Sequence, residues 1–90
     1  MLEDFLDRID VWADSQQPSQ DLVLHVMAWL LTRYEDPYQG VRREPGFDNL
    51  WQATIPHTHH RGYVVVCSYF IYEGERKLRC NAFATLGWPV

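Results

Sequence analysis

The chain has 90 residues, which is enough for one domain and too few for two. Hydrophobic residues make up 47% of it and charged residues 22%, a composition that argues against an intrinsically disordered chain. The formal net charge is −4, which argues against nonspecific nucleic-acid binding over the whole surface, because phosphate contacts need local positive potential.

The charge is unevenly distributed along the chain. Up to Tyr38, eight acidic residues stand against two basic ones, which gives −6. From Gln39 onward, six basic residues stand against four acidic ones, which gives +2. A basic surface confined to the second half is therefore compatible with the acidic total.

The N-terminal stretch has no basic flank and no long apolar run, so we do not expect a signal peptide. The longest apolar segment, residues 26–31, is far too short to span a bilayer. Two cysteines are too few for a disulfide-built mini-protein, and the cytosol would keep them reduced. The sequence therefore predicts a cytoplasmic protein without a membrane segment.

Apolar residues at helical spacing predict two helices. The first covers residues 2–14 and leads into a turn with Pro18; the second covers residues 20–35, with Ser19 as N-cap, and stops before Pro37. The apolar positions are Leu2, Phe5, Leu6, Ile9 and Trp12 in the first helix, and Leu22, Val23, Val26, Met27, Leu30, Leu31 and Tyr34 in the second. Because the connection is short, we expect an antiparallel helical hairpin.

Strand signals dominate the second half. After an irregular loop over 36–48, a weakly alternating strand is predicted at 50–55. A polar loop at 57–62 leads into the clearest strand, 63–72, which is dense in β-branched and aromatic residues, and a partner strand follows at 77–86.

The predicted fold class is α+β. Residues 1–90 form a single domain, in which an N-terminal antiparallel helical hairpin (1–36) packs on a three-stranded antiparallel β-sheet (49–86).

The register of the final predicted hairpin determines which side chains share a face of the sheet. If Glu73-Gly74 is a two-residue turn, Tyr72 faces Glu75 and Cys67 faces Cys80. The core face then carries Tyr63, Val65, Cys67, Tyr69, Ile71, Leu78, Cys80, Ala82, Ala84 and Leu86. The opposite face carries Val64, Val66, Ser68, Phe70, Tyr72, Lys77, Arg79, Asn81 and Phe83. This second face mixes cations, aromatics and polar groups, and we expect any anionic ligand to bind there.

The cysteines allow two interpretations. In the expected register Cys67 and Cys80 occupy a non-hydrogen-bonded pair, about 4.5 Å apart at Cα, which suits a cross-strand disulfide under oxidising conditions. Two buried thiols that behave as small apolar side chains are the favoured alternative.

Other polar clusters give weaker signals. His57, His59 and His60 offer imidazoles for a metal ion, but the loop lacks a second ligand pair at suitable spacing. The favoured interpretation is an exposed loop without a site. An intermediate interpretation is that these histidines supply a general base or contact RNA. Arg42-Arg43 would either contact phosphate or balance nearby acids. No Gly-rich phosphate loop, nucleophile elbow or CxxC motif is present.

From Tyr34 onward the chain resembles the RelE/ParE superfamily of bacterial toxins. The matching pieces are a helix that ends near Pro37, the stretch Asn49-Leu50-Trp51-Gln52-Ala53-Thr54-Ile55-Pro56, the long strand after Gly62, and the final strand from Leu78 to Leu86. The helical hairpin also fits that fold. Two parts of the family pattern are not seen in the sequence, namely a first strand before the helices and a basic stretch after the last strand.

The resemblance implies a toxin-like component of a toxin–antitoxin system, acting on mRNA or translation by metal-independent RNA cleavage or binding. It implies no cofactor, and its candidate partners are an antitoxin protein and mRNA or the ribosome. For an endoribonuclease, proton-transfer groups and cations would surround the phosphate. The catalytic candidates are Lys77, Arg79, His59, His60 and Tyr72, and the RNA-binding candidates are Arg43, Arg61, Ser68, Phe70 and Asn81.

Two other functions are kept as alternatives. The first is a non-enzymatic protein-interaction module that uses the acidic helix face and Trp88. The second is a metal-binding or redox domain that uses the His loop or the cysteine pair.

Overall fold

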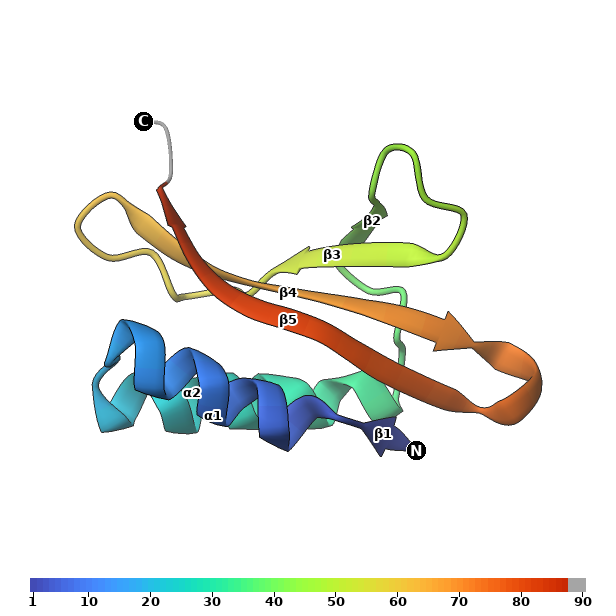
Figure 1. The fold of residues 1–90 in the computed structure, drawn as a ribbon, viewed down its shortest axis with the longest axis horizontal. Coiled ribbons are helices and arrows are strands. Elements are labelled where there is room, and N and C mark those ends of the chain that lie inside the picture. The colour runs from blue at the N-terminus through green and yellow to red at the C-terminus, as the bar shows by residue number, and fades with distance from the viewer. Residues whose placement is uncertain (88–90) are drawn as a thin grey trace.

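The computed structural model describes residues 1–87, so the predicted interaction residue Trp88 lies outside the described part of the chain. Residues 1–87 form two helices packed on one face of a five-stranded mixed sheet (Figure 1). The elements in chain order are β1 (Leu2–Glu3), α1 (Phe5–Gln16), α2 (Gln20–Leu31), a 3₁₀ turn η1 (Thr32–Tyr34), β2 (Val41–Arg43), β3 (Leu50–Thr54), β4 (Tyr63–Tyr72), a second 3₁₀ turn η2 (Glu73–Glu75) and β5 (Lys77–Gly87). The strand order is β1-β5-β4-β3-β2, so β4 lies in the middle of the sheet. Within residues 1–87, no helix is long and apolar enough to cross a membrane.

The α+β class is confirmed, but the three-stranded sheet is wrong, because a short strand lies at each edge. Strand β1 runs parallel to β5, with Leu2 opposite Leu78. Leu2 does not belong to the first helix, because Asp4 has φ 65° and separates the two elements. Strand β2 lies within the predicted loop and pairs antiparallel with β3. Two or three residues are too few to show a strand's period in sequence.

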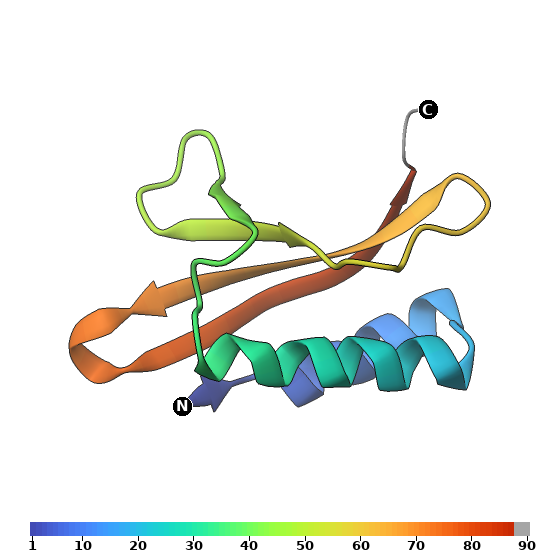
Figure 2. The same ribbon diagram turned by 180° about the vertical axis from the view of Figure 1, so that it is seen from behind.

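The helical hairpin forms much as expected and covers one side of the sheet (Figures 1 and 2). Helix α1 ends where Gln17 adopts a left-handed conformation and its N–H bonds the Ala13 carbonyl at 3.0 Å. Helix α2 begins after the predicted cap, because the Ser19 hydroxyl accepts a hydrogen bond from the Leu22 N–H at 3.2 Å. The connection between the helices is therefore closed by local hydrogen bonds at both of its ends.

The core lies between the helices and the sheet and is rich in aromatic rings. Phe5 packs against Tyr69 and Phe83 with ring centroids 5.9 and 6.3 Å apart, and Trp12 lies 6.4 Å from Phe83. The indole N–H of Trp12 donates to the Thr85 hydroxyl at 2.9 Å, which satisfies the polar atom of a ring that is 1% exposed. Helix α1 is thereby attached to the second half of β5.

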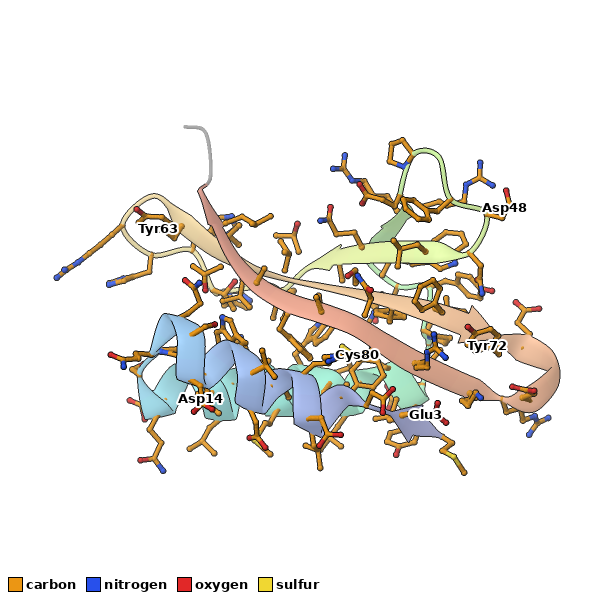
Figure 3. The ribbon with its side chains drawn as sticks, in the orientation of Figure 1. Glu3, Asp14, Asp48, Tyr63, Tyr72 and Cys80 are labelled. Carbon is orange, nitrogen blue, oxygen red and sulfur yellow. The ribbon has the colours of Figure 1, made fainter. Side chains whose placement is uncertain are left out.

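The turn between β4 and β5 differs from the predicted two-residue turn. Tyr72 pairs with Lys77, so residues 73–76 form the turn, and Arg76 takes the left-handed conformation at φ 49°. The predicted pairing of Cys67 with Cys80 is wrong, since Cys80 lies opposite Tyr69. The register moves by two residues, which preserves the alternation of faces near the turn. Leu78 and Cys80 therefore face the helices, as expected, and Figure 3 shows Cys80 between β5 and the helices.

A β-bulge then reverses the faces of the rest of β5. The register shifts between Ser68 and Tyr69, and Asn81 is the extra residue, because Ser68 pairs with Ala82 while Tyr69 pairs with Cys80. Phe83, predicted on the open side, is instead in the core at 7% exposure. The predicted core positions Ala82, Ala84 and Leu86 are correspondingly wrong, because the bulge turns them away from the helices.

The bulge leads to a stability prediction for two phenylalanines. Phe83→Ala removes a buried ring that contacts Phe5 and Trp12, and should lower the free energy of unfolding by roughly 3–5 kcal/mol. Phe70→Ala removes the same side chain from the open face and should cost clearly less. Urea unfolding of both variants gives the comparison, and equal losses would contradict the assigned faces.

Candidate functional site

The sheet face that points away from the helices carries the candidate site, which we call the open-face cluster. It consists of Ser68, Phe70 and Tyr72 on β4 and Lys77, Arg79 and Asn81 on β5. Cross-strand register brings them together, because Tyr72 lies opposite Lys77 and Phe70 lies opposite Arg79. The two central strands of the sheet therefore place six of the residues predicted from sequence on one surface.

Within the cluster, each cation lies over an aromatic ring. The Arg79 guanidinium carbon is 5.5 Å from the centre of the Phe70 ring, and the Lys77 ammonium nitrogen is 5.2 Å from that of Tyr72. The two rings are stacked, with centroids 6.4 Å apart and planes inclined by 25°. This arrangement presents positive charge and aromatic faces side by side.

The polar end of the cluster lies at the bulge. The Asn81 amide donates to the Ser68 hydroxyl at 3.0 Å, so the extra residue of β5 is held against β4. Gln52 lies opposite Ser68, and Arg42 lies opposite Gln52, with its guanidinium donating to the Gln52 side chain at 3.5 Å. Arg42 therefore belongs to the same face, whereas Arg43, the predicted phosphate contact, pairs with Trp51 on the helix-facing side.

The two cations differ in their electrostatic partners. Lys77 pairs with Glu75 at 3.3 Å and with Glu3 at 3.7 Å. The hydrogen bond to Glu75 is the main cause that raises the pKa of Lys77 above its ordinary value of 10.5. Between residues 1 and 87 no carboxylate lies within 4.0 Å of the Arg79 guanidinium. Arg79 is therefore the cation whose charge is more available to a ligand.

The predicted histidines and Arg61 lie at the opposite end of the sheet. They belong to the β3–β4 loop, which is closed by mutual backbone hydrogen bonds between His60 and Tyr63 at 2.8 and 2.9 Å. Strand β4 runs over ten residues from Tyr63 to Tyr72, which is a length of about 30 Å. Figure 3 labels these two tyrosines at opposite ends of the strand. The structure thus does not bring His59, His60 or Arg61 to the open-face cluster.

A separate hollow of about 590 Å³ adjoins that loop and is lined by His25, His57, His59 and His60. The His25 ring bonds the Pro56 carbonyl at 2.8 Å and lies 6.3 Å from the His57 ring. In the part of the chain that the structure describes, no three His, Cys, Asp or Glu side chains are grouped so as to hold a metal ion. The hollow therefore gives no positive support to a metal centre.

Both cysteines are free thiols in the core. Burial is the main cause that raises the pKa of Cys67 well above its ordinary value of 9.0, and the neighbouring Cys80 thiol adds to it. The two sulfurs lie 3.9 and 3.8 Å from the same Ser68 carbonyl oxygen. Because the thiolate is the reactive form, the environment of Cys67 favours an inert packing role.

A buried arginine anchors the loop beside the cluster, and no local pattern in the sequence marks it as a site residue. Arg33 is 4% exposed and lies 4.6 Å from the centre of a Trp29 ring. It donates to the Gln39 carbonyl at 2.7 Å and to the Tyr69 hydroxyl at 3.2 Å, and that hydroxyl donates to the Pro37 carbonyl at 2.5 Å. Neutral acceptors thus stabilise this buried charge and tie the loop after α2 to the central strand.

A hollow of about 490 Å³ adjoins the turn end of the cluster and shares Tyr72 and Lys77 with it. Tyr34 and Tyr38 contribute to its wall. The Tyr38 hydroxyl donates to Glu73 at 2.5 Å, and this hydrogen bond raises the pKa of Tyr38 above its ordinary value of 10.0. Aromatic surface therefore continues from the open face around the end of the sheet.

No protein-family model, curated protein or solved structure matches this chain.

The buried tyrosine at the centre of the loop anchor gives a pH prediction. Burial raises the pKa of Tyr69 above its ordinary value of 10.0, although Arg33 opposes the shift. The folded state thus holds the phenol proton more tightly than the unfolded state. The contribution of this difference to the free energy of unfolding is present below about pH 10, the pKa of tyrosine in the unfolded state. It is lost as the pH rises through the pKa of Tyr69 in the folded state.

Tyr69→Phe should therefore show a smaller alkaline loss of stability than the wild type. At neutral pH it should be less stable by roughly 1–3 kcal/mol, since Arg33 and the Pro37 carbonyl lose their partner. Tyr63→Phe, at a side chain 55% exposed, is the matched control. Urea unfolding at neutral and alkaline pH measures both effects, and identical pH profiles for Tyr69→Phe and the wild type would refute the assignment.

Proposed function

We propose that this protein is a toxin-like, RNA-directed domain that binds single-stranded RNA on the open-face cluster and blocks translation. The observation that carries the proposal is the pairing of Arg79 with Phe70 and of Lys77 with Tyr72 on one sheet face. Proteins that bind single-stranded RNA combine cations for the phosphates with aromatic faces on which bases stack. The contact between Ser68 and Asn81 adds hydroxyl and amide groups that can bond base edges or the 2′-hydroxyl.

Binding is better supported than cleavage by the groups on this face. Cleavage by the 2′-hydroxyl needs a proton acceptor, a proton donor and charge stabilisation. Arg79 can stabilise charge and the Tyr72 hydroxyl can donate a proton. However, Lys77 is protonated at neutral pH like any ordinary lysine and is paired with Glu75 and Glu3, and the predicted bases His59 and His60 lie at the far end of β4. We therefore place RNA binding first and metal-independent cleavage second.

The resemblance to the RelE/ParE superfamily supports the same proposal. Such toxins usually begin with a strand before the helices, and β1 of this chain supplies a short one beside β5. Their C-terminal basic stretch has no counterpart, because residues 83–90 contain no Lys or Arg. This difference agrees with a domain that acts mainly by binding. The partners implied by the proposal are mRNA or the ribosome and an antitoxin protein.

Fluorescence anisotropy with a labelled single-stranded RNA at low salt tests the proposal. Arg79→Gln should weaken binding on the order of tenfold and should reduce the slope of log K against log salt by about 1, because one phosphate contact is lost. Arg8→Gln, which makes the same change of charge on α1, should leave binding unchanged. Equal weakening by the two variants would indicate net charge as the cause and would overturn the assigned face.

Induction in bacteria distinguishes the two possible actions on mRNA. Wild-type protein should arrest growth, and the Lys77→Ala/Arg79→Ala double variant should not. Intact mRNA during arrest corresponds to binding alone, whereas discrete cuts correspond to cleavage. Normal growth and intact mRNA with soluble wild-type protein would count against a toxin-like role.

A further inference from the structure

The outer side of α2 is apolar, although nothing within residues 1–87 buries it. Val26, Trp29 and Leu30 on its inner side are at most 8% exposed. On the outer side Leu24 is 56% and Leu31 is 63% exposed. A helix that is hydrophobic on both sides is normally covered on both sides.

The exposed residues form one line along the helix, which we call the α2 outer stripe. Its members are Leu24, Met27, Ala28 and Leu31. The spacings of three and four residues place them on a single face of the helix. Scattered exposed leucines are ordinary, but a contiguous apolar stripe marks a surface that binds a partner.

We propose that the α2 outer stripe is an interface between two copies of this chain, in which the two α2 helices pack antiparallel. With the two-fold axis between Met27 and Ala28, Leu24 lies opposite Leu31 of the second copy. Met27 then lies opposite Ala28 of the second copy, so a long side chain meets a small one. The stripe is thus self-complementary, as a two-fold interface requires.

The charges at the ends of α2 favour the antiparallel arrangement. Asp21 lies in the first turn of α2, and residues 28–31 at the other end of the helix include no acid. An antiparallel pair therefore places the two Asp21 carboxylates at opposite ends of the interface. A parallel pairing would set Asp21 against its own copy and align the two helix dipoles unfavourably.

The size and charge of the stripe define the kind of dimer. Twelve residues of helix span about 18 Å, so a single helix pair buries less than the roughly 800 Å² per partner that is usual in stable complexes. The helical part also carries the −6 charge of the first 38 residues. We expect a concentration-dependent dimer that is strengthened by salt, because salt screens this repulsion.

The dimer would leave the open-face cluster accessible, since the helices cover the other side of the sheet (Figures 1 and 2). The two surfaces are therefore independent. A failure of RNA binding would not affect self-association, and a monomeric protein would not affect the proposed RNA face.

Sedimentation velocity of the full chain over a range of concentrations and salt tests the interface. The wild type should shift from monomer to dimer as concentration rises, and Leu31→Glu should remain monomeric. Val11→Glu, at an α1 side chain that is 59% exposed, makes the same kind of change outside the stripe and should still dimerise. Thermal unfolding of both variants verifies that they are folded. A wild type that is monomeric throughout, or a dimer unaffected by Leu31→Glu, would overturn the proposal.

Disulfide cross-linking tests the register separately. A mixture of Leu24→Cys and Leu31→Cys proteins should cross-link on mild oxidation, whereas Leu24→Cys alone should do so poorly. The native Cys67 and Cys80 are at most 2% exposed and should not form cross-links. Efficient cross-linking of Leu24→Cys with itself would indicate a parallel pairing and contradict the antiparallel one.

Discussion

The antiparallel ladder between β4 and β5 is the constraint on which the rest of the molecule depends. Its pairing of Tyr72 with Lys77 and its bulge at Asn81 decide which cross-strand pairs face the helices and which face away. On one side the ladder supplies much of the aromatic core. On the other it sets cations, rings and polar groups next to one another. A change of one residue in this register would exchange the two sets and remove both the core and the candidate site.

The bulge allows β5 to meet two requirements that a regular strand could not meet together. Near the turn, β5 must keep Lys77 and Arg79 in solvent, while farther along it must deliver Phe83 and Thr85 to α1. One extra residue satisfies both. The Asn81 side chain is held by Ser68 at the point where the faces exchange, so the irregularity in the backbone lies within the site itself.

Sequence periodicity was sufficient for the two helices and the three longer strands, because each spans several repeats of its period. It failed for β1 and β2, which are too short to show one. It also failed for the turn, where Arg76 and not a glycine takes the left-handed conformation, and for the bulge, which has no local signal. The faces of Lys77 and Arg79 were nevertheless predicted correctly, since the register error was an even number of residues. Contacts between distant segments, such as Arg33 with Tyr69, are set by tertiary packing and have no local pattern.

The proposed function requires that RNA binds the face built by the β4–β5 ladder. Titration of isotopically labelled protein with a short single-stranded RNA, followed through amide chemical shifts, locates the bound surface. The largest changes are expected in Ser68, Phe70 and Arg79, with small changes in α1 and α2. Changes confined to the loop at 57–62 or to the helices, with the ladder unaffected, would contradict it.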